Sequence, residues 1–207
     1  CLYCIANEKP EPTPFAPGNL LEKDDFNLSL PFYLSPWTDC YPKIESREGR
    51  TRQVLQKLKK QDASYFVITK GTGIYRYEDL FHDTQKTFVA LSLNSLDSST
   101  QTFFEPDLPL FKERMNLIEG LIHDQNIRVV IKIDPVIPGI TDTNQLQFLL
   151  TWIRKIKPYA VTSETMRLTR SIAQKFKSAL PRALYNKILA YYGTPSDLPQ
   201  HPSLSYR

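Results

Sequence analysis

The sequence predicts an α/β fold with parallel strands, and three observations lead to this prediction. Short apolar runs alternate with amphipathic segments of helical period along most of the 207 residues. Strands that alternate with helices pair in parallel, because each crossover returns the chain to the same end of the sheet. The strands are nearly continuous apolar runs, as in a sheet covered on both faces, and polar side chains follow their carboxyl ends.

In the first half of the chain, three apolar runs predict strands, and helices are expected between them. Val54, Leu55 and Leu58 share one face of a segment whose other face carries Lys and Gln, which predicts an amphipathic helix. Prolines recur before the first strand and predict a loop there. In order, we expect a loop over 5–29, a strand over 30–34, a helix over 50–60, a strand over 65–69, a short helix over 78–82 and a strand over 88–91.

The second half continues the alternation and adds two further strands. Apolar residues recur at a helical period from Leu110 to His123, and Pro181 divides the last helical segment into two. Three prolines after Gly193 predict an irregular tail over 193–207, so the core is expected to span 1–192. The remaining expected elements are a helix over 110–123, strands over 129–133 and 159–162, a helix over 145–156 and two helices within 171–192.

Composition and charge exclude several classes of protein. An apolar content of 41% provides the core of one soluble domain, and no run of about eighteen apolar residues could span a membrane. Three cysteines, an odd number, argue against a disulfide framework and predict a reducing, cytoplasmic location. A net charge of +4 permits a nucleic-acid partner without arguing for one, because Lys and Arg are scattered along the sequence.

Polar residues follow the predicted strands at the edge where parallel sheets bind ligands. Ordinary loop polarity explains many of them equally well. It explains Lys70 least well, because this lysine directly follows an apolar Val-Ile-Thr run. The residues at these strand ends are Asp39, Lys70, Ser92, Asn94, Asp134 and Glu164.

The most informative stretch is Cys1-Leu2-Tyr3-Cys4, a C-x-x-C motif. Two thiolates at this spacing bind zinc, bind an iron–sulfur cluster or close a redox disulfide, and two unrelated cysteines are the plain alternative. The prolines that follow disfavour the helix of a thioredoxin-like motif. Zinc needs further ligands in paired spacing, which the other candidates do not offer: Cys40, His82, His123 and His201. A chain that opens on this motif is expected to continue upstream in a longer protein.

Several short motifs occur in a particular order. Cys1-Leu2-Tyr3-Cys4-Ile5-Ala6-Asn7 matches the second half of a C-x-x-x-C-x-aromatic-C signature. The others are Thr38-Asp39 with Tyr41-Pro42 and Glu45, Thr69-Lys70 with Arg76, Ser92-Leu93-Asn94, Glu105-Pro106 with Pro109 and Arg114, and Asp134-Pro135 with Pro138-Gly139 and Asp142. In this order they resemble the radical S-adenosylmethionine superfamily, and within it the branch related to spore photoproduct lyase. The spacing from Tyr41 to Glu45 is one residue shorter than in that family.

The resemblance implies both a fold and a chemistry. The fold is a partial (β/α)6 TIM-like barrel of parallel strands whose first strand is missing. Three cysteine thiolates would hold a [4Fe–4S] cluster, and the first of them would lie four residues before Cys1. The open iron would bind S-adenosylmethionine, and reductive cleavage would give a 5′-deoxyadenosyl radical that abstracts hydrogen from an unknown substrate. An electron donor such as flavodoxin or ferredoxin would be a partner, and nucleic acid is a candidate substrate.

The resemblance also assigns roles to individual residues. Cys1 and Cys4 would be cluster ligands, and Tyr3 would pack near the adenine. For Arg114 an ion pair with Glu105 is an equal alternative to binding the cofactor. The residues that would contact S-adenosylmethionine are Tyr3, Lys70 and Arg114 (the last two at the carboxylate), Ser92 and Asn94 (at the ribose or methionyl group), and Val136 and Ile137 (beside the adenine).

The substrate side departs from the lyase pattern. Ser35 and Asp39 are expected to face the substrate. The lyase has a hydrogen-donor cysteine at a position held here by Pro36 or Trp37, so repair of thymine photoproducts is not expected. Cys40 is either a radical relay or an ordinary loop cysteine, and Cys40 and Asp39 are weak catalytic candidates. With two of the three cysteines, the chain alone is expected to be inactive.

Two alternatives from other classes remain. A non-catalytic relative could keep the fold and bind nucleic acid through Tyr33, Trp37 and Tyr41 together with cations. That alternative predicts salt-dependent DNA binding without a cluster. A zinc-binding or purely structural domain predicts zinc by elemental analysis and no binding of S-adenosylmethionine.

Overall fold

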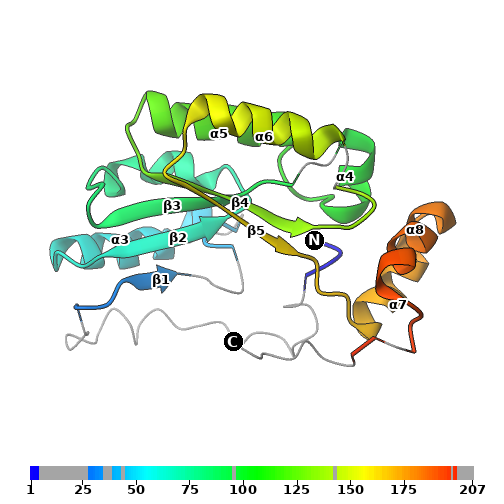
Figure 1. The fold of residues 1–207 in the computed structure, drawn as a ribbon. Coiled ribbons are helices and arrows are strands. Elements are labelled where there is room, and N and C mark those ends of the chain that lie inside the picture. Colours follow the sequence, from blue (N-terminus) through cyan, green and yellow to red (C-terminus); the bar gives the residue numbers. More distant parts are fainter. Residues whose placement is uncertain are drawn as a thin grey trace.

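Five parallel strands form one sheet, and they follow one another in the sheet in the order of the sequence (Figure 1). The computed structural model describes residues 1–4, 28–34, 39–42, 45–94, 97–141, 144–196 and 198–199. Every neighbouring pair of strands is parallel, which confirms the predicted α/β class. The strands are β1 (Phe32–Leu34), β2 (Tyr65–Thr69), β3 (Thr87–Ser92), β4 (Val129–Val136) and β5 (Ala160–Thr165).

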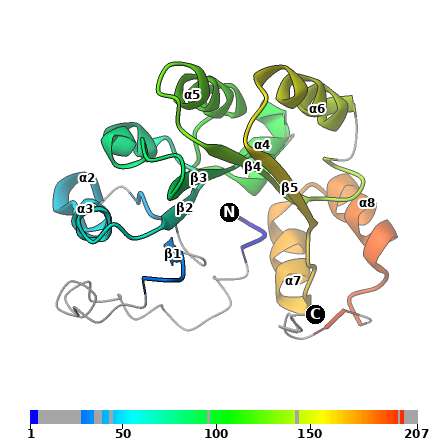
Figure 2. The ribbon, with the colours of Figure 1, turned by 60° about the vertical axis from the view of Figure 1, so that its left-hand side comes forward.

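The helices between the strands cover one face of this sheet. Figure 2 shows α3, α5 and α6 outside the curved sheet, with the N-terminal residues on its other side. The helices are α2 (Glu45–Glu48), α3 (Arg50–Lys60), the 3₁₀ helix η2 (Gly73–Leu80), α4 (Ser98–Phe104), α5 (Phe111–His123), α6 (Asn144–Ile156), α7 (Arg170–Ala179) and α8 (Arg182–Tyr192). No helix in the described ranges is long and apolar enough to cross a membrane.

The element boundaries agree with the sequence prediction in most places. The helix over 50–60 and the strand over 65–69 have the predicted limits, and Pro181 separates α7 from α8. The short helix predicted over 78–82 is wrong: this segment is the end of a 3₁₀ helix that begins at Gly73. Ile74, Tyr77 and Leu80 are its buried residues, and their spacing of three matches the three residues per turn of a 3₁₀ helix.

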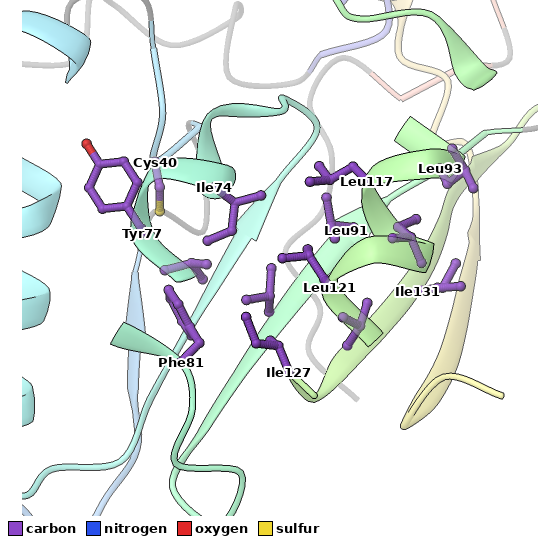
Figure 3. Packing of buried hydrophobic residues seen from close by; sticks show 14 of the residues in the cluster. Cys40, Ile74, Tyr77, Phe81, Leu91, Leu93, Leu117, Leu121, Ile127 and Ile131 are labelled. Carbon is purple, nitrogen blue, oxygen red and sulfur yellow. The ribbon is translucent and has the colours of Figure 1, made fainter. Parts of the chain in front are cut away.

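The main hydrophobic core lies between the sheet and the helices that cover it (Figure 3). Along β2, burial alternates, so that Tyr65, Val67 and Thr69 are buried while the residues between them are half-buried. Leu91 on β3 and Ile131 on β4 are fully buried in the same cluster. This packing fixes the directions in which the strand ends present the residues that follow them.

A second hydrophobic cluster joins the first turn of the chain to the last two helices. It contains Tyr3, Phe104 and Ile137 together with Phe176 of α7 and Ile188 of α8. The Phe104 ring meets the Phe176 ring edge-on at a centroid distance of 5.6 Å. The N-terminal turn therefore packs against segments that are distant in the sequence.

Aromatic rings on β1, β2 and β3 stack in a row across the sheet. The parallel register places Tyr33 beside Phe66 and Phe66 beside Phe88. Their ring centroids are 4.6 and 4.4 Å apart, in stacked geometry.

Strand β5, at the opposite edge of the sheet from β1, is not covered on both faces. Its residues 161–165 are exposed, so β5 departs from the expectation that the strands are covered on both faces.

Candidate functional site

Five polar side chains from separate parts of the chain meet at the carboxyl ends of β2 and β3. We call Tyr3, Lys70, Asn94, Glu105 and Arg114 the Glu105 cluster. Lys70 directly follows β2, Asn94 lies just beyond β3, and Arg114 belongs to α5. Tyr3 comes from the first turn of the chain, and Glu105 follows α4. Four of these five residues are ones that the resemblance assigns to the cofactor.

The Lys70 ammonium is fully engaged within this cluster. Its Nζ lies 2.6 Å from the Tyr3 hydroxyl, 3.0 Å from Glu105 Oε1 and 3.2 Å from the backbone oxygen of Asp134. An ammonium has three N–H donors, so these three acceptors use all of them. The ammonium also lies 4.6 Å from the centre of the Tyr3 ring, at cation–π distance.

Arg114 is fully buried and pairs with the same carboxylate. Its Nη2 donates to Glu105 Oε2 at 2.7 Å, and its Nη1 donates to the backbone oxygen of Ser92 at 3.3 Å. The ion pair with Glu105, which was the alternative role for Arg114, is therefore present. The carboxylate consequently binds Lys70 through one oxygen and Arg114 through the other.

Tyr3 and Asn94 complete the hydrogen bonds around the carboxylate. The Tyr3 hydroxyl donates to Glu105 Oε1 and accepts from Asn94 Nδ2 at 2.8 Å. Asn94 Nδ2 also lies 3.1 Å from Glu105 Oε1. Glu105 and Asn94 are each 1% exposed, so these bonds form away from bulk water, where they are stronger than at a surface.

The electrostatics of the cluster favour an ionised Glu105. Burial raises the pKa of this carboxyl, but the charges of Lys70 and Arg114 and the Tyr3 hydrogen bond outweigh burial and lower the pKa to about 2. Burial raises the pKa of the Tyr3 hydroxyl well above its ordinary value, and the Glu105 carboxylate raises it further. With two cations, one carboxylate and a neutral phenol, the cluster has a net charge of +1.

Two buried polar atoms of the cluster have no hydrogen-bond partner among the described residues. They are Asn94 Oδ1, an acceptor, and Arg114 Nε, a donor. Buried polar atoms in folded proteins are nearly always hydrogen-bonded, and an exception calls for an explanation. Together with the net positive charge, they are groups that a polar, anionic ligand could engage.

The thiols of Cys1 and Cys4 lie on the turn that carries Tyr3. The Cys4 amide donates to the Cys1 backbone oxygen at 3.2 Å, which closes the turn. The Leu2 amide donates to the backbone oxygen of Phe104 at 2.8 Å, which ties the turn to the segment containing Glu105. Cys1 is exposed, Cys4 is half-buried, and neither forms a disulfide.

This turn carries two cysteine side chains, and cysteine thiolates are the usual ligands of iron–sulfur clusters. Within the described ranges, no group of three or more His, Cys, Asp or Glu side chains is arranged to hold a metal ion. Two cysteine thiols on one short turn fit an iron–sulfur cluster in ligand type, and the neighbouring net positive charge fits an anionic cofactor. The two unpartnered buried atoms of Asn94 and Arg114 agree with this fit.

The Asp39 side chain links the segment after β1 to the end of β2. Its carboxylate accepts from Thr69 Oγ1 at 2.8 and 2.9 Å, from the Lys70 amide at 2.9 Å and from the Tyr41 amide at 2.8 Å. Asp39 thereby fixes the end of β2 against the segment after β1. Its proposed roles in catalysis and on the substrate side stay predictions, and Ser35 lies outside the described residues.

The remaining predicted residues are buried to different degrees. The Cys40 thiol is buried and lies 3.6 Å from the backbone oxygen of Leu34. Ser92 is buried and Ile137 is fully buried in the second hydrophobic cluster, while Val136 is half-buried at the end of β4. Their contacts with a cofactor stay predictions.

Glu105 is the central residue of the site, and the sequence prediction did not place it there. It was recognised as part of a Glu-Pro motif and as an alternative partner for Arg114. An acidic residue directly after the apolar pair Phe103-Phe104 is a signal of a buried carboxylate that needs cations. That signal could have identified it.

Comparison with known proteins gives a distant relative. The chain is 27% identical over 114 residues to an uncharacterised protein, MJ0683, of Methanocaldococcus jannaschii. The match covers 55% of this chain and 43% of the relative, so the chain spans less than half of that protein. No protein-family model matches the chain, and no solved structure matches it.

Proposed function

We propose that this chain is the core of a radical S-adenosylmethionine enzyme whose substrate is not yet known. One observation carries the proposal. Tyr3, Lys70, Asn94 and Arg114, which the motif resemblance assigns to the cofactor, converge at the edge of the sheet next to the Cys1–Cys4 turn. The residues come from four distant segments, and chance loop polarity does not explain their convergence.

The residues that would hold the cofactors follow from the contacts. Cys1 and Cys4 would be two of the thiolate ligands of a [4Fe–4S] cluster. When bound, the cluster would supply one electron for cleavage of the sulfonium of S-adenosylmethionine. The net charge of +1 would attract the carboxylate of S-adenosylmethionine, and the free oxygen of Asn94 would accept a hydrogen bond from its polar groups.

Glu105 acts in this proposal as a positioning residue. It holds Lys70 and Arg114 in fixed places before any ligand arrives, so the ligand does not have to order these long side chains. Because Glu105 neutralises one of the two cations, the Glu105 cluster keeps a net charge of +1, which matches one anionic group of a ligand. Tyr3, held by the same carboxylate, couples the position of the thiol turn to the position of the cations.

The proposal includes a partial (β/α)6 barrel in which a first strand would precede Cys1. The consecutive order of the five strands supports it, because right-handed crossovers between neighbouring strands place every helix on the same face. A doubly wound sheet needs a reversal of strand order to cover its second face. The five described strands have no such reversal.

The test uses the full-length natural protein, purified without oxygen and reconstituted with iron and sulfide. We expect absorbance near 400 nm and, after S-adenosylmethionine and a reductant are added, formation of 5′-deoxyadenosine. Cys4→Ala should abolish both. Cys40→Ala is the matched control, because it removes a buried thiol outside the turn, and it should keep the cluster absorbance.

Failure of this experiment would be clear. A folded protein that binds no iron after reconstitution would overturn the proposal. Retention of the cluster in Cys4→Ala would show that another set of ligands holds it. Loss of the cluster in Cys40→Ala with an intact fold would place Cys40 among the ligands instead of the turn.

A nucleic-acid-binding function is the second candidate, and a specific surface favours it. Between Met166 and Ser196, which include α7 and α8, there are six cations and no acid, although the chain contains 26 cations and 22 acids. The cations are Arg167, Arg170, Lys175, Lys177, Arg182 and Lys187. Five of them are exposed, and the apolar side chains Ile172 and Phe176 of α7 are buried, so this surface is suited to phosphates rather than to insertion in a bilayer.

The second candidate predicts binding that depends on salt. Fluorescence anisotropy with a labelled duplex should show affinity that falls steeply between 50 and 200 mM salt, roughly tenfold or more for several phosphate contacts. Replacing Lys177 and Arg182 by Gln should weaken binding. Replacing Lys59 and Lys60 of α3 is the matched control and should leave it unchanged. Binding without any iron or sulfide would favour this candidate over the enzyme.

A further inference from the structure

A separate pocket lies between the segment that follows β1 and the segment that follows β2. Its volume is about 330 Å³. The Glu105 cluster does not line it. The lining residues are Tyr41, Pro42, Glu45, Ser46, Thr72, Gly73, Tyr75, Arg76 and Tyr77.

Two sequence motifs each place residues that lie outside the Glu105 cluster in this pocket. Tyr41, Pro42 and Glu45 belong to the motif after the first strand, and Arg76 belongs to the motif after the second. They are separated by about thirty positions in the chain. The pocket therefore gives these residues a common location that the cofactor proposal does not explain.

Three of the residues that line the pocket are tyrosines. The rings of Tyr41 and Tyr77 pack against each other with centroids 4.8 Å apart. Tyr41 lies directly on Gly73, where an added Cβ would come within 2.6 Å of the Tyr41 Cβ. Tyr75 is 57% exposed at the pocket, so one large ring is available to a ligand.

One hydroxyl in the pocket is buried without a partner. The Tyr41 hydroxyl has no hydrogen-bond partner among the described residues. Burial raises the pKa of this hydroxyl well above its ordinary value, and the nearby Cys40, Tyr77, Asp39 and Glu45 raise it further. It is therefore a neutral donor at any physiological pH.

The charged groups of the pocket leave a cation available. Glu45 is buried, and its Oε1 accepts from the Thr51 amide at 2.7 Å, from the Arg52 amide at 3.2 Å and from the Tyr77 hydroxyl at 2.9 Å. Arg76 is exposed and makes no ion pair within the described part of the chain. The Glu45 carboxylate is thus satisfied by hydrogen bonds within the protein, while the Arg76 guanidinium is exposed to solvent at the pocket.

We infer that this pocket binds a small planar anion, an aromatic ring that carries a phosphate or carboxylate group. The tyrosine rings supply the aromatic surface, Arg76 supplies the positive charge, and the Tyr41 hydroxyl supplies a hydrogen-bond donor. A pocket of this volume has room for one ring with its substituents. The inference does not require the iron–sulfur cluster or S-adenosylmethionine.

The pocket is connected to the Glu105 cluster by one side chain. The Asp39 carboxylate accepts from the amide of Tyr41 at 2.8 Å and from the amide of Lys70 at 2.9 Å. A ligand that moves Tyr41 would therefore act on the backbone of Lys70 through a single shared carboxylate.

The test measures binding of four probes to the full chain by saturation-transfer NMR and calorimetry. Phenyl phosphate and benzoate carry both a ring and an anionic group, while inorganic phosphate and benzyl alcohol each carry one of the two. We expect the first two to bind at least about tenfold more tightly than the last two, because a charge-assisted hydrogen bond and ring contact act together. Whichever of phenyl phosphate and benzoate binds more tightly identifies the anionic group that the pocket prefers.

Three substitutions locate the site. Arg76→Gln should weaken binding of the better probe about tenfold, which corresponds to one charge-assisted hydrogen bond. Tyr41→Phe keeps the ring and removes the hydroxyl, and it should weaken binding several-fold. Arg154→Gln is the matched control, because Arg154 of α6 is also an exposed arginine but does not line the pocket, and it should have no effect.

Two results would overturn the inference. The first is that phenyl phosphate and benzoate bind no better than inorganic phosphate and benzyl alcohol. The second is that Arg76→Gln and Arg154→Gln weaken binding equally, which would indicate attraction to the overall charge. Arg76 is exposed, so its variant keeps the test decisive even if Tyr41→Phe fails to fold. Neither result bears on cluster binding or on formation of 5′-deoxyadenosine.

Discussion

Lys70 and Glu105 are 35 residues apart in the sequence, and Lys70 Nζ lies 3.0 Å from Glu105 Oε1. The same carboxylate reaches Arg114 of α5 through its other oxygen. One acidic side chain therefore joins the end of β2 to a helix on the outer layer, and this pairing organises the candidate site.

Glu105→Gln should destabilise the fold strongly. The substitution leaves the buried Arg114 without a counter-charge, and removing one partner of a buried ion pair costs about 3–5 kcal/mol. Urea unfolding followed by circular dichroism measures this loss. Glu164→Gln is the matched control, because the Glu164–Arg167 pair is more than half exposed and should contribute less than about 1 kcal/mol. Equal losses for the two variants would contradict the structure.

Stability should fall in acid through Glu105. Burial opposes ionisation of this carboxyl, but Lys70 and Arg114 lower its pKa from 4.5 to about 2 in the folded chain. The resulting stabilisation, about 3 kcal/mol, is fully present above the unfolded pKa and is lost as the pH falls toward the folded pKa. Between pH 5 and pH 2 the wild type should therefore lose about 3 kcal/mol more than Glu105→Gln. Parallel pH profiles for the two proteins would refute this assignment.

Gly73→Ala should be much more disruptive than Gly71→Ala. A Cβ at Gly73 would lie 2.6 Å from the Tyr41 Cβ, whereas a Cβ at Gly71 would meet its nearest atom, Thr69 Oγ1, at 3.7 Å. Overpacking of this kind costs about 1–3 kcal/mol, while an ordinary contact costs little. Thermal unfolding of the two variants measures the difference. A larger effect at Gly71 would show that Tyr41 does not lie on Gly73.

Asp39→Ala should loosen two specific amides without unfolding the chain. The Asp39 carboxylate accepts from the amides of Tyr41 and Lys70, and both lose their acceptor in the variant. Hydrogen exchange followed by NMR should show faster exchange at these two positions, since protection reflects local hydrogen bonding. Asp107→Ala, at an exposed position, is the control and should leave both exchange rates as they are in the wild type.

Much of the fold could be predicted because the strands and long helices have strong periodicity. The limits of α3 and β2 follow directly from runs of apolar residues. The prediction missed α2 and α4, which are too short to show a clear helical period. For α4 a local signal was present, since Asp97 caps the helix by accepting from the Thr100 amide at 2.8 Å.

The site could be predicted only where a residue's position depends on its own strand. Lys70 and Asn94 follow strands that share an edge, and that rule alone brings them together. Glu105 lies after α4, and its direction depends on how that helix packs. The sequence signal for this packing is weak, so the central carboxylate emerged only from the structure.

The hydrogen bond from the Leu2 amide to the Phe104 backbone oxygen has a consequence for the order in which the protein assembles. Tyr3 and Glu105 are 102 positions apart, so the two thiols reach their final location only after the segment behind α4 has folded. During synthesis, the turn that carries the thiols would leave the ribosome long before the segment around Phe104, against which it packs, has been made. We therefore expect any metal delivered to this turn to be captured late, by a chain that is already largely folded.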